Sequence, residues 1–170
     1  MRLRRASIAD IPFLMSTERQ PGYDRLVGRF TEQEHIANLA DATAAYQIAL
    51  GDDGHGLGFV FFRDLDDAHN NLYIKRVIVA APDQGVGTAM MRLALDWAFS
   101  EAGAQRIWLT HLPENLRARA LYTKLGFQQE GVLRHAYGKT DGTRGDLMQM
   151  SLLKSEWAEI RVREIQIGLD

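Results

Sequence analysis

Polar and apolar positions alternate over Arg2, Leu3 and Arg4, and a short first strand is predicted over residues 2–6. A helix follows, because Asp10 can cap it with Pro12 in the first turn, and this helix is expected to extend to about Arg19. Residues 31–34 carry the side chains of a capping box and predict a second helix. Two helices are therefore expected between the first strand and the second.

Three predicted strands then follow one another with only short polar segments between them. They cover residues 45–50, 57–65 and 71–79, and the connecting segments are rich in Gly, Asp and Asn. Consecutive strands joined by such turns pair as hairpins. This part of the chain predicts an antiparallel meander.

The rest of the chain alternates helices with strands. Apolar residues at helical spacing follow a turn at residues 84–89, and Gly103 can end that helix. A strand, a helix closed by Gly126 and two more strands are expected over residues 106–112, 115–125, 127–136 and 146–153. We therefore predict an α+β fold with a mixed, mostly antiparallel sheet of about seven strands, flanked by about four helices.

Residues 154–170 fit neither the helical nor the strand period cleanly, so the pattern predicts no conformation for them. We expect residues 1–153 to form one domain, because a chain of 170 residues that is 46% hydrophobic can fill a sizeable core and shows no linker. The tail, residues 154–170, is expected to pack on this domain or to contribute to a dimer.

The turn at residues 84–89 contains Gly85 and Gly87, directly after an apolar strand and at the start of a helix. Glycines let successive amides point into one concavity, and the helix start adds unpaired N–H groups and a positive dipole end. This arrangement favours a phosphate. A tight strand-to-helix turn without a ligand is the alternative interpretation.

Composition excludes several classes of function. With 20 basic and 22 acidic residues the formal net charge is −2, so the chain lacks the broad positive surface of nucleic-acid-binding proteins. It has no cysteine, its five histidines show no His-x-x-x-His spacing, and the P-loop pattern is absent, so we expect no metal site and no P-loop enzyme. No apolar run approaches the ~18 residues of a membrane span, and we expect a soluble cytoplasmic protein without nucleic-acid or membrane partners.

A second motif covers residues 115–127 and reads Asn-x-x-Ala-x-x-Leu-Tyr-x-Lys-x-Gly-Phe. The glycine turn fits (Arg/Gln)-x-x-Gly-x-(Gly/Ala) as Gln84, Gly87 and Ala89. In this order, with one helix and one strand between them, the two motifs resemble the GNAT superfamily of acetyl-CoA-dependent N-acetyltransferases. The resemblance covers about residues 3–153. It extends to the branch that includes ribosomal-protein N-terminal acetyltransferases.

The resemblance implies acetyl-CoA as co-substrate. Its pyrophosphate would lie on the amides of residues 84–88, and its pantetheine arm would pair with main-chain groups in a splay between two parallel strands. The residues implied to bind it are Ile78, Val79, Ala80, Gln84, Gly85, Val86, Gly87, Thr88, Asn115, Ala118, Tyr122 and Lys124.

The resemblance also implies that Tyr122 protonates the leaving thiolate, a task suited to a phenol whose unperturbed pKa lies near ~10. Packing of this tyrosine on the sheet is the alternative. Many family members carry a glutamate as general base before the glycine turn, but residues 70–77 contain no carboxylate. His111 is the candidate base, ahead of Glu114 and Asp146. A surface histidine without a role, and proton loss to water, are the alternatives.

The implied acceptor is a primary amine of a small molecule or of a peptide N-terminus, which attacks in a ternary complex. Its specificity is expected to come from the first two helices, the loop at residues 20–30 and the hairpin at residues 137–144. Lys75 and Arg76 point to opposite faces of a regular strand, so only one can face the acceptor groove, where it would favour an acceptor with an anionic or carbonyl group. Exposed charges on a half-solvated strand are the preferred interpretation for both. A catalytically silent acyl-CoA sensor or interaction module is the alternative function, and a homodimer is expected because similar proteins often dimerise.

Overall fold

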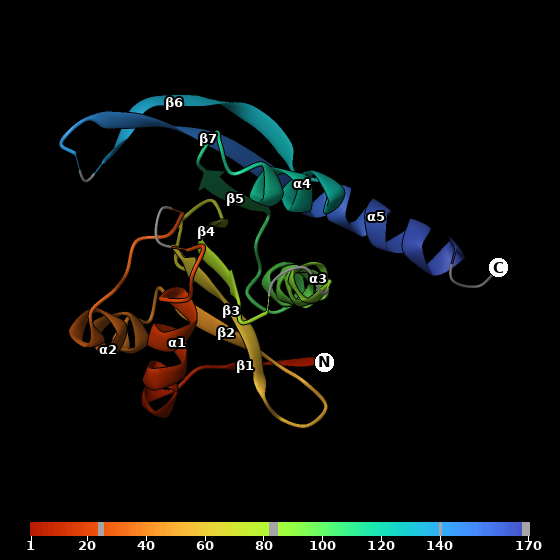
Figure 1. Cartoon of the computed structure of the whole chain (residues 1–170). Coiled ribbons are helices and arrows are strands. Elements are labelled where there is room, and N and C mark those ends of the chain that lie inside the picture. The colour runs from red at the N-terminus through yellow and green to blue at the C-terminus, as the bar shows by residue number, and fades with distance from the viewer. Residues whose placement is uncertain (24–25, 82–84, 140, 168–170) are drawn as a thin grey trace.

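The computed structural model describes residues 1–23, 26–81, 85–139 and 141–167, and it shows a twisted sheet with helices on both faces (Figure 1). In chain order the elements are β1 (Arg2–Arg5), the 3-10 helix η1 (Ile8–Asp10), α1 (Ile11–Glu18), α2 (Glu32–Ala40), β2 (Ala45–Leu50), β3 (Gly56–Arg63), β4 (Asn71–Val79), α3 (Val86–Ser100), β5 (Arg106–His111), α4 (Leu116–Lys124), β6 (Gln128–Gly138), β7 (Arg144–Leu153) and α5 (Lys154–Ile167).

The strands form one seven-stranded sheet in the order β1-β2-β3-β4-β5-β7-β6. Strands β4 and β5 pair in parallel, and every other neighbouring pair is antiparallel. The predicted meander of β2, β3 and β4 and the mixed α+β fold are confirmed. Within the described ranges there are five α-helices, one more than the sequence predicts, because the tail is helical.

The continuous apolar run of β3 fills two cores at once. Successive side chains of a strand point to opposite faces of the sheet. Phe59 and Phe61 therefore pack with Leu14 of α1 in one core, while Val60 and Phe62 belong to the core that contains the buried face of α3. Figure 1 shows α1 and α2 on the first side of the sheet and α3 on the second.

Capping side chains set the starts of two helices that border the site. At α2 the Thr31 hydroxyl accepts from the Glu34 amide at 3.2 Å and the Glu34 carboxylate accepts from the Thr31 amide at 2.7 Å, which confirms the predicted capping box. At α4 the Asn115 side chain accepts from the Ala118 amide at 3.0 Å. The sequence therefore determines locally where both helices begin.

Helix α5, the tail without a predicted conformation, is fixed to α3 by one buried side chain and several polar ones. Trp157 is only 4% exposed, lies in the same core as α3, and its indole N–H donates to Asp96 at 2.9 Å. Arg161 pairs with Asp96 at 3.2 Å, and Arg92 pairs with Glu164. The helical period is hidden in the sequence because Ile160 is only partly buried and the remaining large apolar residues of α5, Val162, Ile165 and Ile167, are exposed.

We expect Trp157→Ala to lower the free energy of unfolding by about 3–5 kcal/mol, because it leaves a cavity and removes a buried hydrogen bond to Asp96. The matched variant Val162→Ala removes an apolar side chain that is 54% exposed on the same helix, and it should change stability by less than about 0.5 kcal/mol. Urea denaturation of both variants measures the difference. Equal stability of the two variants would show that α5 is not anchored as described.

Candidate functional site

The site begins where β4 and β5 part. Their parallel register runs from Asn71 opposite Arg106 to Ile74 opposite Leu109, and β4 continues beyond this to Val79. A register shift between β3 and β4 opposite Phe61 and Phe62 accompanies the separation. The last residues of β4 thus border a gap where β5 no longer supplies hydrogen-bond partners, which is the parallel splay that the resemblance implies.

Within this part of β4, Val79 offers its main-chain groups to the gap. The amide of Ala80 donates to Leu57 on the β3 side at 2.8 Å, and Ile78 lies opposite Phe59. Because antiparallel pairing alternates along a strand, the N–H and C=O of Val79 face away from β3. Ile78 is fully buried in the core beneath α1. Of Ile78, Val79 and Ala80, the three residues predicted to bind the cofactor here, Val79 therefore has the suitable orientation.

A glycine sets the position of this edge. Gly58 of β3 lies opposite Val79, and a Cβ there would come within 2.4 Å of the Ile78 carbonyl oxygen and 2.9 Å of the Val79 Cα. Real Cβ atoms do not approach main-chain atoms so closely, so residue 58 must be glycine for β3 and β4 to keep their spacing.

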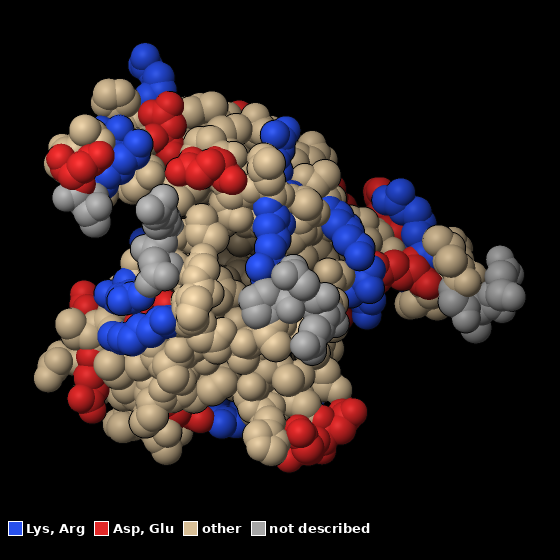
Figure 2. All heavy atoms as spheres, in the orientation of Figure 1, with Lys and Arg blue, Asp and Glu red and all other residues tan. Residues whose placement is uncertain are grey.

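The gap opens into a pocket of about 360 Å³ between β4, the start of α3, helix α4, residues 21–23 and Leu26. Figure 2 shows this face of the molecule hollowed near its centre, with basic side chains beside the hollow. The described residues that line it are Pro21, Gly22, Tyr23, Leu26, Val77, Val79, Gly85, Gly87, Thr88, Asn115, Arg117, Ala118, Ala120, Leu121, Tyr122 and Lys124. Most of the residues that the sequence predicts for the cofactor are in this group.

The two glycines of the turn have different reasons to be glycine. Gly85 is the N-cap of α3 with a φ of 75°, a conformation that disfavours a side chain. Gly87 has an ordinary φ, and a Cβ there would meet Val79 and Leu121 only at normal contact distances of 3.6 and 3.8 Å. Among the residues that the structure describes, no contact thus requires a glycine at 87, which fits a ligand that approaches the helix start. Gln84, predicted for the same site, lies outside the described residues.

Tyr122 of α4 lines the pocket and is 7% exposed. Burial raises the pKa of Tyr122 above its ordinary value, and the nearby phenols of Tyr73 and Tyr23 act in the same direction. The hydroxyl therefore keeps its proton at neutral pH. Asn115, Ala118 and Lys124 of the same motif line the same pocket.

His111 lies next to Tyr122 but does not line the pocket. The alternative of a surface histidine is wrong, because the residue is 6% exposed at the end of β5. Its ring centroid is 6.1 Å from that of Tyr122, and its Nδ1 is 2.8 Å from the Leu112 carbonyl oxygen. A hydrogen bond from Nδ1 leaves Nε2 as the basic nitrogen.

Ala80 and Val86, also predicted for the cofactor, are half-buried and are not in the pocket wall.

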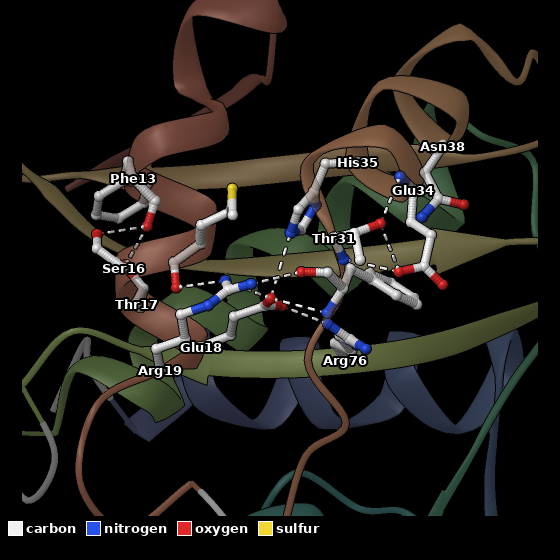
Figure 3. Close-up of polar contacts among 12 residues, drawn as sticks. Phe13, Ser16, Thr17, Glu18, Arg19, Thr31, Glu34, His35, Asn38 and Arg76 are labelled. Carbon is white, nitrogen blue, oxygen red and sulfur yellow. Dashed lines mark hydrogen bonds and ion pairs between the residues drawn. The ribbon is translucent and has the colours of Figure 1, made fainter.

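The expectation of an exposed Arg76 is wrong, because this side chain pairs with a buried carboxylate (Figure 3). Arg76 donates to Glu18, which is 0% exposed at the end of α1, and the guanidinium lies 3.4 Å from the centroid of the Phe30 ring. Burial lowers the pKa of Arg76, and the charge of Glu18 opposes this shift. Lys75, by contrast, is exposed as expected.

The same cluster fastens both ends of the segment that borders the pocket. Glu18 accepts from the Phe30 amide at 2.9 Å and from Arg19 at 3.0 Å, and it lies 3.4 Å from His35. Arg19 donates to the Phe30 carbonyl at 2.7 Å. Residues 18–19 and 30 are thus joined to each other and, through Arg76, to β4. The sequence does not show this cluster, because its members are scattered along the chain.

The pocket also contains residues that the sequence analysis missed or assigned elsewhere. Val77 precedes Val79 by two positions and Leu121 precedes Tyr122, so strand alternation and the motif itself could have indicated them. Tyr23 belongs to the loop expected to bind the acceptor. No sequence signal places it against β4, where its hydroxyl lies 3.0 Å from the Val79 amide nitrogen.

Among residues 1–23, 26–81, 85–139 and 141–167, no group of three or more His, Cys, Asp or Glu side chains could hold a metal ion. In the same ranges no helix has both the length and the apolar character needed to cross a membrane.

Comparison with curated proteins finds acetyltransferases of bacteria. A putative ribosomal N-acetyltransferase, YdaF, of Bacillus subtilis (strain 168) is 30% identical over 106 residues, which cover 62% of this chain and 57% of that protein. Spermidine N(1)-acetyltransferase of Escherichia coli (strain K12) is 30% identical over 88 residues, which cover 50% of this chain and 46% of that protein. The match thus spans about half the length of each relative.

Among solved structures, spermidine N-acetyltransferase from Vibrio cholerae in complex with CoA and spermine superposes with a TM-score of 0.80. The two chains are 21% identical, and the superposition covers 92% of this chain and 96% of that one, so the likeness is one of fold. The family described as the Acetyltransferase (GNAT) family matches residues 12–127 of this sequence. On this match, which includes both motifs and most of the pocket wall, the chain belongs to the GNAT family of acetyltransferases.

Proposed function

We propose that the protein transfers the acetyl group of acetyl-CoA to a primary amine of a small molecule or of a peptide N-terminus. The observation that supports this most strongly is the composition of the pocket. It joins the main-chain edge of Val79, the uncapped start of α3 and the buried phenol of Tyr122. These three parts match the three parts of acetyl-CoA that need recognition, which are the pantetheine amides, the pyrophosphate and the thioester.

The residues present suit coenzyme A. The amides of Val86 and Gly87 precede the first main-chain bonds of α3, which Thr88 and Ala89 donate to the Gly85 carbonyl, and Gly85 provides no side-chain cap. The pyrophosphate can therefore accept from the amides of Val86 and Gly87. Lys124 and Arg117 add positive charge to the pocket wall. Val79 supplies one donor and one acceptor for a pantetheine amide. Acetyl-CoA itself supplies the activated thioester.

The chemistry requires that the amine attack as its neutral form. Its nitrogen forms a bond to the thioester carbon, the carbon–sulfur bond breaks, and the amine loses a proton. We propose that Tyr122 protonates the leaving thiolate, since burial keeps its hydroxyl protonated at neutral pH. Nε2 of His111, through water, or bulk water takes the proton of the amine, because β4 carries no carboxylate. A main-chain N–H of the β4 edge stabilises the oxyanion.

A catalytically silent acyl-CoA sensor is the second candidate function. The absence of a carboxylate between Asn71 and Val79 favours it, since it leaves no side-chain base on β4. Spermidine and a ribosomal protein, which the names of relatives give as substrates of those proteins, are acceptors to test here.

Other expectations stay predictions. A homodimer is consistent with the exposed apolar residues of α5, namely Val162, Ile165 and Ile167. A cytoplasmic location is consistent with the lack of cysteine. The division into a domain of residues 1–153 and a tail can be tested by truncating the chain after residue 153. Trp157 packs α5 against the core.

The function is tested by following coenzyme A release from acetyl-CoA with a panel of acceptors. The panel contains polyamines, amino acids, aminoglycosides and peptides with free N-termini, each compared with its N-blocked form. We expect release with at least one free amine and none with its blocked form, because only the free amine is a nucleophile. Tight acetyl-CoA binding without release for any acceptor would favour the sensor.

We expect Tyr122→Phe to lower kcat about 100-fold or more and to change coenzyme A affinity by less than about twofold, because the ring and its packing remain while the proton donor is lost. Steady-state kinetics and calorimetry separate the two effects. The circular dichroism spectrum and the urea midpoint serve as controls for folding. Unchanged kcat in a folded variant would assign Tyr122 a packing role only.

We expect Gly87→Ala to stabilise the fold and to weaken the binding of coenzyme A. Alanine raises helix propensity by about 0.5–1 kcal/mol, and among the described residues beyond its own helix the new Cβ meets no atom closer than 3.6 Å. The same Cβ obstructs a phosphate at the helix start, so coenzyme A affinity should fall about tenfold or more. Gly85→Ala is the contrasting variant, because its φ of 75° should make alanine destabilising. A Gly87→Ala protein that binds coenzyme A as well as wild type contradicts the pyrophosphate assignment.

A further inference from the structure

We propose that the hydroxyl of Tyr23 is an internal competitor of the cofactor. It occupies both main-chain groups of Val79 that the pantetheine arm needs, so coenzyme A must displace it to bind. This inference rests on the proposed function, since it concerns the same pocket.

The contact is two-sided. The amide of Val79 donates to the Tyr23 hydroxyl oxygen at 3.0 Å, and that hydroxyl donates to the Val79 carbonyl oxygen at 3.2 Å. Both groups belong to the edge of β4 that faces away from β3. The phenol thus makes the donor and acceptor pair that an amide of pantetheine would otherwise make.

The need for such a partner follows from burial. Val79 is 6% exposed, and the parting of β4 and β5 removes the neighbouring strand that would normally bond to its N–H and C=O. A buried main-chain group without a partner is unfavourable, so the empty pocket would be costly without Tyr23. The hydroxyl satisfies the edge in the absence of ligand.

The Tyr23 hydroxyl and pantetheine cannot both bond to the main chain of Val79 at the same time. The N–H of Val79 has one hydrogen to donate, and the Tyr23 ring is itself part of the pocket wall, beside Val77 and Tyr122. Displacement can be local, because Glu18, Arg19 and Phe30 fasten the ends of this segment. Gly22, next to Tyr23, has a φ of 95°, and apart from its chain neighbours no atom of the described residues lies within 4 Å of the position that a Cβ would take there.

The competition predicts that Tyr23→Phe binds coenzyme A more tightly than wild type. The variant keeps the ring but loses both hydrogen bonds, so the ligand no longer has to break them. Titration calorimetry with coenzyme A should give a dissociation constant about threefold to tenfold lower. Ser16→Ala, which removes a hydroxyl that bonds to Phe13 on helix α1, is the matched control and should bind as wild type does. Equal or weaker binding by Tyr23→Phe would overturn the competition.

A second measurement needs no ligand. The exchange rate of the Val79 amide hydrogen, measured by NMR, should rise at least threefold in Tyr23→Phe, because its acceptor is gone. Unchanged protection would show that the hydroxyl does not hold this amide, and would also overturn the proposal. If neither protein binds coenzyme A at all, the proposed function fails. If both proteins bind coenzyme A with equal affinity, only the proposed competition by Tyr23 is overturned, and the proposed function stands.

Discussion

The site depends on the early end of the pairing between β4 and β5. A parallel pair that continued to Val79 would bond every main-chain group of β4 to a neighbour and leave no edge for a ligand. The pairing stops at Ile74 and Leu109, and the register of β4 against β3 shifts at the same level. Helices α3 and α4 then begin near the opened edge. One local interruption of the sheet thereby positions the main-chain edge, the helix start and Tyr122 around a single pocket.

The buried pair of Glu18 and Arg76 holds the opposite side of the pocket in place. It joins the end of α1 to β4, and Glu18 also accepts from the Phe30 amide. Burial of two charges is unfavourable unless they are paired and further hydrogen-bonded, and Arg19 and His35 add such contacts around Glu18. The cluster thus holds Arg19 and Phe30, near the two ends of the segment between α1 and α2, against each other. Replacement by apolar residues would preserve burial but not this connection.

Much of the fold follows from local signals in the sequence. The Thr31 capping box, the Asn115 cap and the two-core pattern of β3 each depend on neighbouring residues, so a pattern can show them. The pocket wall is largely predictable for the same reason, because the glycine turn and the α4 motif are continuous segments. Contacts that join distant segments cannot be predicted from a local pattern. The burial of Arg76 depends on Glu18, 58 residues away, and Tyr23 meets Val79 across 56 residues.

Two further differences between the sequence-based predictions and the structure also arise from packing between distant segments. The helix of the tail was not predictable, because only Trp157 of its large apolar residues is well buried and the period is therefore lost. His111 reads as a surface residue in the sequence, since it ends a strand and precedes a loop. Its burial comes from the packing of α4 over the end of β5, where the rings of His111 and Tyr122 lie 6.1 Å apart.

The contact between Gly58 and β4 limits how this protein can diversify. Substrate range in an enzyme usually changes through side chains that line the pocket, and here those belong mainly to α4 and to the segment after α1. Residue 58 lies behind the edge, outside the pocket wall, yet any side chain there would press on Ile78 and Val79. Mutational tolerance should therefore be low at a position that touches no ligand. In a library of variants, Gly58 should be retained as strictly as the residues of the pocket itself.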